Sequence, residues 1–351
     1  MTVPTDHGIR EHAGIKQASD DTLVSVSGLT KHFPIRKGIL ARTVGSVRAV
    51  DGVSFTVARG ETLGLVGESG CGKTTLGRTL LRLEEPTAGE ILVNGEDICG
   101  FSRSKLRTAR RHMQMVFQDP YSSLNPKMTV RDAITEAVRC HGLAEGNRDD
   151  EARRLLAEVG MGEDALHRYP HEFSGGQRQR ISVARALSLR PELLVCDEAV
   201  SALDVSVQAQ ILNLLVDLRE RHSLSYLFVS HDLSVVQAVA HRIAVMYLGK
   251  LVEVGPAHQV TKRPAHPYTE ALLSAVPVPG ADKKKRIVLE GDPPSPSRPP
   301  AGCRFHPRCP RVMPRCREEE PPFYDVDGVQ TACFLHSHAA PDPVPDKADR
   351  A

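Results

Sequence analysis

The stretch Gly67-Glu-Ser-Gly-Cys-Gly-Lys-Thr-Thr75 matches the pattern G-x-x-x-x-G-K-[ST], which is typical of a loop that holds the phosphates of a nucleotide. It follows the apolar run Thr62-Leu-Gly-Leu-Val66, which we interpret as a buried parallel strand. An apolar-faced helix is predicted directly after the loop, over residues 76–83. Strand, loop and helix therefore stand in the order that the pattern requires, and they predict an α/β fold around a phosphate-binding loop (P-loop).

The residue types of the P-loop indicate its chemistry. Glycines let backbone N–H groups converge on phosphate oxygens, and the helix start adds the positive end of its dipole. We expect Lys73 to reach the β- and γ-phosphates, Thr74 to ligate Mg²⁺ and Thr75 to add a phosphate contact. Cys71 needs only to be small at its position, so we assign it no redox role. The residues predicted to bind ATP here are Gly67, Glu68, Ser69, Gly70, Cys71, Gly72, Lys73, Thr74 and Thr75.

Acidic residues end a second apolar run. Leu193-Leu-Val-Cys-Asp-Glu198 predicts a buried strand, so Asp197 lies where a carboxylate can hold Mg²⁺, and Glu198 where it can orient and deprotonate a water molecule. A solvated acidic strand end is the simpler alternative. His231 follows the apolar run Tyr226-Leu-Phe-Val229 and is expected at the carboxyl end of a strand, where open α/β sheets bind ligands. A single histidine taken alone is more often structural.

A second glycine-rich helix start has no lysine. Ser174 precedes Gly175-Gly176-Gln177 and is a good N-cap for a helix over residues 177–187. A helix start that carries a serine and two glycines can bind an anion. An ordinary capped helix would explain the serine but not both glycines. We therefore expect Ser174 to Gln177 to complete a nucleotide site on a partner chain.

These stretches together resemble the motifs of the ABC ATPases, in the order of that family. Besides the P-loop, Met115-Val-Phe-Gln118 resembles the Q-loop, Phe173-Ser-Gly-Gly-Gln177 the signature, Leu193 to Glu198 the Walker B strand, Ser201-Ala-Leu-Asp204 the D-loop and Phe228-Val-Ser-His231 the switch histidine. The resemblance implies a P-loop NTPase fold with a RecA-like core, an antiparallel β subdomain and a helical subdomain that carries the signature. Phe173 stands where leucine is commoner, and Ala199 where proline is commoner, which should alter loop stiffness more than chemistry.

The same resemblance implies roles for single residues. It makes Glu198, His231 and Gln118 catalytic, assigns Mg²⁺ to Thr74, Gln118 and Asp197, and assigns Asp204 to the D-loop. Phe33 stands where the family has an aromatic that stacks on adenine, which would contribute about 1–3 kcal/mol. Packing of Phe33 on a neighbouring strand is the alternative.

Composition favours an ordinary globular chain that relies on partners. The 351 residues, 40% apolar, suffice for one large domain and a small appendage, and a net charge of +2 gives no strong field for nucleic acid, so we expect no nucleic-acid partner. No stretch of about 18 apolar residues occurs, so any transport must use partner chains. We predict a mobile N-terminal arm (1–22), an ATPase domain (23–260) richer in helical and polar sequence over 77–113 and 126–170, a C-terminal extension (261–338) and a disordered tail (339–351).

The C-terminal extension holds Cys303, Cys309, Cys316 and Cys333, spaced C-x5-C-x6-C-x16-C, without the close pairs of most zinc sites. With no export signal, metal ligation is favoured over disulfides. Four such thiolates can hold an iron–sulfur cluster, with zinc and unligated thiols as alternatives. Together with His266-Pro-Tyr268, the segment resembles the C-terminal extension of oligopeptide and dipeptide importer ATPases, which implies a [4Fe–4S] cluster.

Within that family the chain is most similar to the F-type subunit, through Leu76 to Pro86 and Gln118 to Pro126. This resemblance implies an ATPase that powers uptake of di- or oligopeptides, in a heterodimer with a D-type ATPase. It further implies two membrane permeases, an extracytoplasmic binding protein and a place at the cytoplasmic face of the inner membrane. An importer for nickel or another solute is the alternative, and a soluble ABC protein acting on ribosomes or nucleic acid is a more distant one.

Overall fold

The computed structural model of the chain describes residues 21–38, 42–144, 146–275 and 287–337. Most of the predicted N-terminal arm, the basic run at 283–286 and the predicted C-terminal tail lie outside these residues. The strands are β1 (Thr22–Lys37), β2 (Arg42–Ala58), β3 (Thr62–Val66), β4 (Ala88–Val93), β5 (Glu96–Asp97), β6 (Met113–Val116), β7 (Leu193–Asp197), β8 (Ser225–Ser230), β9 (Arg242–Tyr247), β10 (Lys250–Pro256), β11 (Tyr324–Val326) and β12 (Val329–Thr331). The helices are α1 (Lys73–Leu80), α2 (Arg103–Ala109), α3 (Pro120–Ser123), α4 (Val130–Cys140), α5 (Arg148–Glu158), α6 (Gly175–Leu187), α7 (Val205–His222), α8 (Leu233–Val239), α9 (Ala257–Lys262) and α10 (Pro267–Ser274).

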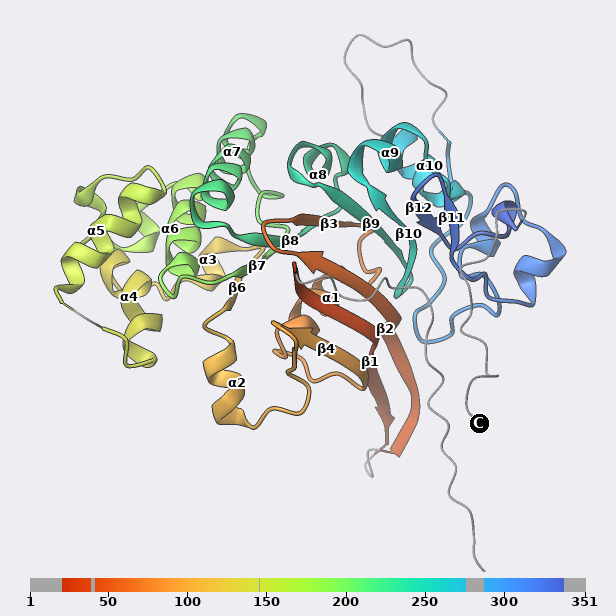
Figure 1. Ribbon diagram of the computed structural model, residues 1–351, viewed down its shortest axis with the longest axis horizontal. Coiled ribbons are helices and arrows are strands. Elements are labelled where there is room, and N and C mark those ends of the chain that lie inside the picture. The colour runs from red at the N-terminus through yellow and green to blue at the C-terminus, as the bar shows by residue number, and fades with distance from the viewer. Residues whose placement is uncertain (1–20, 39–41, 145, 276–286, 338–351) are drawn as a thin grey trace, which may run out of the picture.

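Two sheets enclose helix α1. The larger has the order β11-β12-β10-β9-β3-β8-β7-β6, and the smaller, β2-β1-β4-β5, is antiparallel. Strands β6, β7, β8, β3 and β9 are parallel, so the loops after them share one edge of the larger sheet. Helix α1 lies between the two sheets, while α7, α8 and α9 cover the opposite face of the larger sheet (Figure 1).

The apolar runs of the sequence form the centre of the larger sheet. Strand β3 is buried at all five residues, as are β7 and β8 along their whole length, which explains why these strands read as continuous apolar segments. One core cluster fills the space around α1 between the sheets. A second cluster runs from the far side of the larger sheet into the helices α4, α5 and α6.

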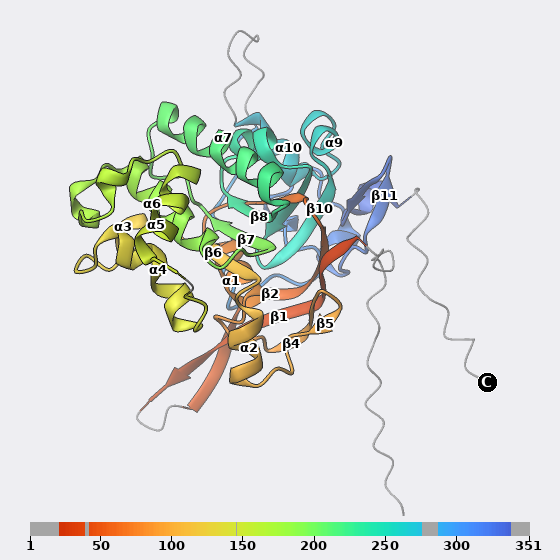
Figure 2. The ribbon, with the colours of Figure 1, turned by 60° about the vertical axis from the view of Figure 1, so that its left-hand side comes forward.

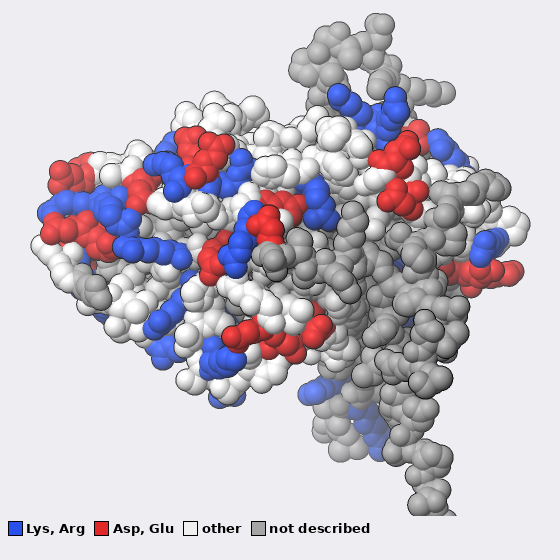
Figure 3. Space-filling model, in the orientation of Figure 1, with Lys and Arg blue, Asp and Glu red and all other residues white. Residues whose placement is uncertain are grey.

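Helices α3 to α6 form a lobe beside the sheets, as predicted for the helical subdomain (Figure 2). Ion pairs join its helices: Arg131 lies 3.1 Å from Asp149, and Arg148 lies 2.7 Å from Asp132. On the face shown in Figure 3, basic and acidic side chains are interspersed over this lobe. In the part of the chain that the structure describes, we find no helix both long and apolar enough to cross a bilayer.

The expectation of helical sequence over residues 77–113 is only partly right. Helices α1 and α2 lie there, but so do strands β4 and β5. Strand β4 pairs with β1, where Val24 opposes Val93. This pairing partner is distant in sequence, so local composition did not reveal it.

Candidate nucleotide site

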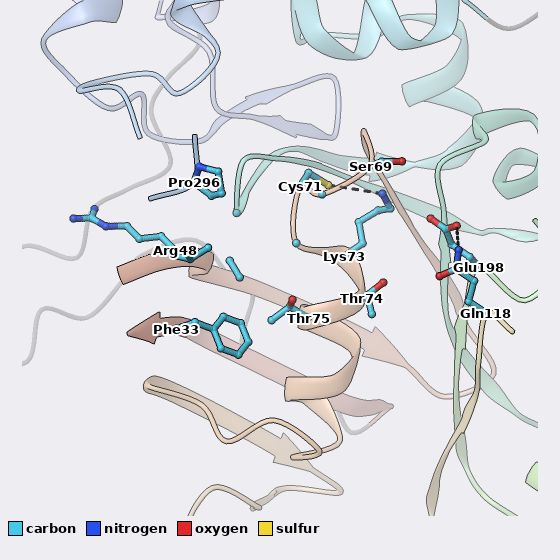
Figure 4. A pocket seen from close by; sticks show the side chains of 15 residues that line it. Phe33, Arg48, Ser69, Cys71, Lys73, Thr74, Thr75, Gln118, Glu198 and Pro296 are labelled. Carbon is cyan, nitrogen blue, oxygen red and sulfur yellow. Dashed lines mark hydrogen bonds between the residues drawn. The ribbon is translucent and has the colours of Figure 1, made fainter. Parts of the chain in front are cut away.

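A cavity of about 450 Å³ opens at the P-loop, between the two sheets. Seven consecutive P-loop residues, Ser69 to Thr75, line it (Figure 4). Gly67 and Glu68, also predicted to bind ATP, are not in the lining. The other lining residues are Phe33, Val47, Arg48, Ala49, Gln118, Glu198, Gly249 and Pro296. The cavity therefore joins residues from β1 and β2, the loops after β6 and β7, and the C-terminal extension.

Lys73 holds the P-loop together from within. Its side chain is almost fully buried, and Nζ donates to the carbonyl oxygens of Gly67 at 2.7 Å and Glu68 at 3.0 Å. Gly72 precedes α1 at φ +111°, and a Cβ there would lie 2.0 Å from the carbonyl oxygen of Ala49. The loop thus needs glycine at this position, because strand β2 approaches it too closely for any side chain.

The predicted metal ligands Thr74 and Asp197 are brought together. Oγ1 of Thr74 donates to Oδ1 of Asp197 at 3.0 Å, across 123 residues of sequence. Burial raises the pKa of Asp197, while the bond from Thr74 and the charges of Arg78 and Lys73 oppose that rise. Gln118, the third predicted ligand, lines the cavity, whereas Asp197 is not among the lining residues.

Glu198 contacts both of the other residues predicted to be catalytic. Its Oε2 accepts a hydrogen bond from Nε2 of Gln118 at 2.9 Å, and its Oε1 lies 3.3 Å from Nδ1 of His231. Glu198 itself has φ +45°, an uncommon left-handed conformation for a non-glycine residue, and its N–H donates to the carbonyl of Val229 on β8. His231 is half exposed and is not part of the cavity lining. The three residues predicted to be catalytic thus lie in contact in the structure, with Glu198 between the other two.

Phe33, Arg48 and Pro296 line the side of the cavity that lies away from Lys73 (Figure 4). In Figure 4 the rings of Phe33 and Pro296 lie on either side of the strand that carries Arg48, whose guanidinium points away from Lys73. The backbone N–H of Arg48 donates to the carbonyl of Pro296 at 3.0 Å. Phe33 was predicted, but Arg48 and Pro296 were not. No local sequence pattern links Pro296 to strand β2, so the contact could not be predicted.

The signature residues lie apart from this cavity. Ser174 caps α6: its Oγ accepts from the N–H of Gln177 at 3.4 Å, and Oε1 of Gln177 accepts from the N–H of Ser174 at 3.0 Å. None of Ser174 to Gln177 lines the P-loop cavity. Gly176 has a packing reason of its own, because a Cβ there would lie 2.4 Å from Cγ1 of Val207 on α7. Asp204 precedes α7 and is exposed, and its side chain makes no cap to that helix.

The prediction of an iron–sulfur cluster is wrong. The described residues include all four cysteines of the extension, and no three or more of their His, Cys, Asp and Glu side chains are grouped so that they could hold a metal ion. Burial raises the pKa of Cys303 to about 11 and that of Cys333 to about 12, and it also raises the pKa of Cys309. Burial therefore favours the neutral thiol at Cys303, Cys309 and Cys333. Cys316 packs with Tyr324 and Phe334 in a small apolar core, with Cys303 against it.

The cavity fits ATP with Mg²⁺. The glycine loop leads into the N-terminus of α1, a suitable place for phosphates, and Lys73 supplies the positive charge. Thr74, Asp197 and Gln118 offer hydroxyl, carboxylate and amide oxygens, the ligand type that Mg²⁺ prefers. The aromatic ring of Phe33 at the far end offers a face for a base.

Comparison with known proteins agrees with this geometry. Residues 50–201 match the family model described as ABC transporter, and residues 252–316 match that of the oligopeptide/dipeptide transporter C-terminal region. The oligopeptide transport ATP-binding protein AppF of Bacillus subtilis is 52% identical over 326 residues, which cover 91% of this chain and 99% of AppF. The chain belongs to the ATP-binding proteins of oligopeptide and dipeptide ABC transporters. As a member of that family, this ABC ATPase binds ATP and couples its hydrolysis to transport.

Further relatives support the assignment. The probable peptide ABC transporter ATP-binding protein y4tS of Sinorhizobium fredii is 54% identical over 323 residues, covering 91% of this ABC ATPase and 92% of its own chain. Among solved structures, the ATP-binding cassette MJ0796, in a dimer bound to ADP and Pi, superposes with a TM-score of 0.59 at 25% identity. That match covers 67% of this chain and 98% of the cassette. The predicted ABC ATPase fold is confirmed.

Proposed function

We propose that this chain hydrolyses ATP to drive the import of di- or oligopeptides through partner permeases. The observation that carries the proposal is a single cavity that unites the P-loop, Phe33, Gln118 and Glu198. The relatives of this chain are named as oligopeptide or peptide transport ATP-binding proteins, and two of them match over 91% of its length. Nothing in the cavity selects a cargo, so peptide as the cargo rests on these relatives.

In this proposal the residues divide the work along the cavity. Lys73 and the P-loop N–H groups bind the phosphates, Phe33 stacks on the base, and Thr74, Asp197 and Gln118 hold Mg²⁺. When bound, Mg²⁺ neutralises charge on the β- and γ-phosphates. Hydrogen bonding between Thr74 and Asp197 supports this role, because it already places two oxygen ligands beside each other.

Glu198 acts on the attacking water. The water oxygen bonds to the γ-phosphorus, the bond from phosphorus to the β–γ bridging oxygen breaks, and Glu198 orients the water and accepts its proton. Gln118 and His231 hold the two carboxylate oxygens at 2.9 and 3.3 Å, which restricts the carboxylate to one orientation. Both residues can then respond to the γ-phosphate by changing their contact with Glu198.

The signature acts on a second subunit. Ser174 to Gln177 would close on the ATP of a partner, and Asp204 would contact that partner. Their distance from the P-loop cavity and the exposure of Asp204 support this arrangement. By the sequences from Leu76 to Pro86 and from Gln118 to Pro126 we assign the chain to the F-type, with a D-type ATPase as partner. In the proposed assembly this chain lies at the cytoplasmic face of the inner membrane, where it binds two permeases, and an extracytoplasmic binding protein delivers the cargo to them.

Replacement of Glu198 by glutamine tests the catalytic role. Glu198→Gln keeps the hydrogen bond from Gln118 but cannot accept a proton, so hydrolysis should fall by about 10²- to 10⁴-fold while ATP binding persists. The rate is measured in the assembled transporter with the partner's ATP site also disabled, and binding by equilibrium dialysis. Near-normal turnover in that variant would refute the role of Glu198. Uptake of labelled peptides and of nickel by the reconstituted transporter tests the cargo, and nickel uptake without peptide uptake would reject peptide import.

A further inference from the structure

The C-terminal extension contacts the P-loop at Glu68. The backbone N–H of Glu68 donates to Oη of Tyr268 at 2.8 Å, and Oε2 of Glu68 accepts from Nη1 of Arg308 at 2.8 Å. The side chain of Glu68 therefore turns toward the extension and away from the cavity that Ser69 to Thr75 line. Both ends of this residue, main chain and side chain, are held by one structural unit.

The extension presents these two groups rigidly. Tyr268 is fully buried, and the Arg308 side chain is only 8% exposed. The ring of Tyr268 packs edge-on against Tyr247, with centroids 4.7 Å apart, and against Phe305 at 5.4 Å. Close packing of three aromatic rings leaves Tyr268 a single position, so its oxygen is a fixed acceptor for the loop.

Glu68, which the extension holds, also binds Lys73 through its backbone carbonyl. The carbonyl oxygens of Gly67 and Glu68 accept both hydrogen bonds of the Lys73 ammonium to backbone oxygens. Any movement of the peptide units around residue 68 would therefore move the acceptors of Lys73, the residue proposed to bind the β- and γ-phosphates.

We propose that Tyr268 and Arg308 are positioning residues of the nucleotide site, which clamp Glu68 and so preorganise Lys73 for the phosphates of ATP. This inference rests on the proposed function. Tyr268 belongs to the His266-Pro-Tyr268 sequence, to which the proposed mechanism otherwise gives no task. His266 caps α10 by accepting from the N–H of Tyr268 at 3.1 Å, and Pro267 begins the helix, so the whole tripeptide sets the place of one phenol oxygen.

The clamp should act on affinity more than on rate. A P-loop that has lost the clamp can still adopt the conformation that binds ATP. The free energy needed to order the loop then lowers the affinity for MgATP. We expect Arg308→Met and Tyr268→Phe each to raise the Kd and KM for MgATP about tenfold, with kcat within threefold of the unaltered chain. Tyr268→Phe keeps the ring and loses only the acceptor, so it tests the clamp even where Arg308→Met fails to fold. Arg308→Lys, which keeps the charge, should recover part of the affinity.

The experiment measures binding of MgATP to the full chain and steady-state hydrolysis in the assembled transporter. Arg311→Met is the matched control, because Arg311 pairs with Glu270 at 2.7 Å on the surface of the same segment and does not touch the P-loop. A double-mutant cycle joins Glu68→Gln and Arg308→Met, and the effects of the two changes on Kd should be far from multiplicative. By linkage, MgATP should slow hydrogen exchange in α10 of the unaltered chain more than in Tyr268→Phe.

The clamp would be overturned if MgATP affinity stayed within twofold of the unaltered chain in both Arg308→Met and Tyr268→Phe, or if the effects in the cycle were multiplicative. A fall in kcat without a change in Kd would also overturn it. Failure of the proposed function looks different, because the unaltered chain would then not bind MgATP and Lys73→Ala would change nothing.

Discussion

His266 gives a quantitative link between pH and stability. The imidazole is fully buried against Phe305, and burial, with a smaller contribution from the charge of His336, lowers the pKa of His266 to about 3. In the unfolded chain the same group titrates near 6.5. The unfolded state therefore binds more protons between these two values. The stability contributed by neutral His266 is complete above pH 6.5 and is lost as pH falls below it.

The size of the loss follows from linkage. Each pH unit below 6.5 removes about 1.4 kcal/mol, so about 2 kcal/mol is lost by pH 5.0 and almost nothing at pH 7.5. Glu253 lies beside His266 and accepts its backbone N–H at 3.0 Å. Burial raises the pKa of Glu253, which gives an opposite slope, with stability lost as pH rises above its unfolded value. The two slopes must be separated by comparison with a variant.

His266→Asn supplies that comparison. Asparagine can still cap the N–H of Tyr268, but it cannot take up a proton, and Glu253 remains in both chains. Urea denaturation followed by circular dichroism at pH 7.5, 6.5 and 5.0 gives the free energy of unfolding. Loss of the ring should destabilise the variant by about 1–3 kcal/mol at pH 7.5. By pH 5.0 this gap, the difference in free energy of unfolding between the unaltered chain and the variant, should narrow by about 2 kcal/mol.

A constant gap across this pH range would refute the burial argument for His266. His258→Asn, the same replacement at an exposed position on α9, is the matched control variant and is measured at the same three pH values. A gap that widened toward pH 5.0 would show that His266 is protonated in the folded chain.

Two further predictions concern the cavity itself. Gly72→Ala should abolish binding of MgATP, because its Cβ would lie 2.0 Å from the backbone oxygen of Ala49. The Cβ of Gly70→Ala would meet no atom within 4 Å, so this variant should weaken binding only through its φ of +78°. Equal losses of affinity in equilibrium dialysis would contradict this difference. Phe33→Ala should weaken ATP binding by about 1–3 kcal/mol, while Phe33→Tyr, which keeps the ring, should bind ATP as the unaltered chain does. If Phe33 served only to pack its strand, alanine would lower the melting temperature and leave the ATP affinity unchanged.

Much of the candidate site could be predicted because its signals are local. Strand β3 has the bounds predicted for it, and the helix expected after Ser174 is α6. Each of these elements depends on residues within one stretch of chain: an apolar run, a capping serine or a glycine pattern. The meeting of Thr74 with Asp197 also followed, because the P-loop after β3 and the carboxyl end of β7 lie at the same edge of the parallel sheet, with only β8 between the two strands.

The rest of the site depends on long-range contacts. Glu68 lies 200 residues from Tyr268 and 240 from Arg308, and no pattern in the sequence pairs them. The error at the cysteines has a related cause. Spacing along the chain does not determine where side chains point, and buried thiols also serve as small apolar groups in a core, as Cys316 does.

The pairing of β12 with β10 bears on how the chain is divided for study. In that pairing Glu253 opposes Thr331, and β11 follows β12 at the margin of the sheet. Without residues 324–331, strand β10 would present a row of unpaired N–H and C=O groups beside a largely buried strand. Exposed edges of this kind recruit strands from other molecules and promote aggregation. A fragment that ends after α9 would thus expose β10 as an unpaired edge strand and should aggregate. A fragment of the ATPase made for study should therefore include the β11–β12 hairpin, which pairs with that edge.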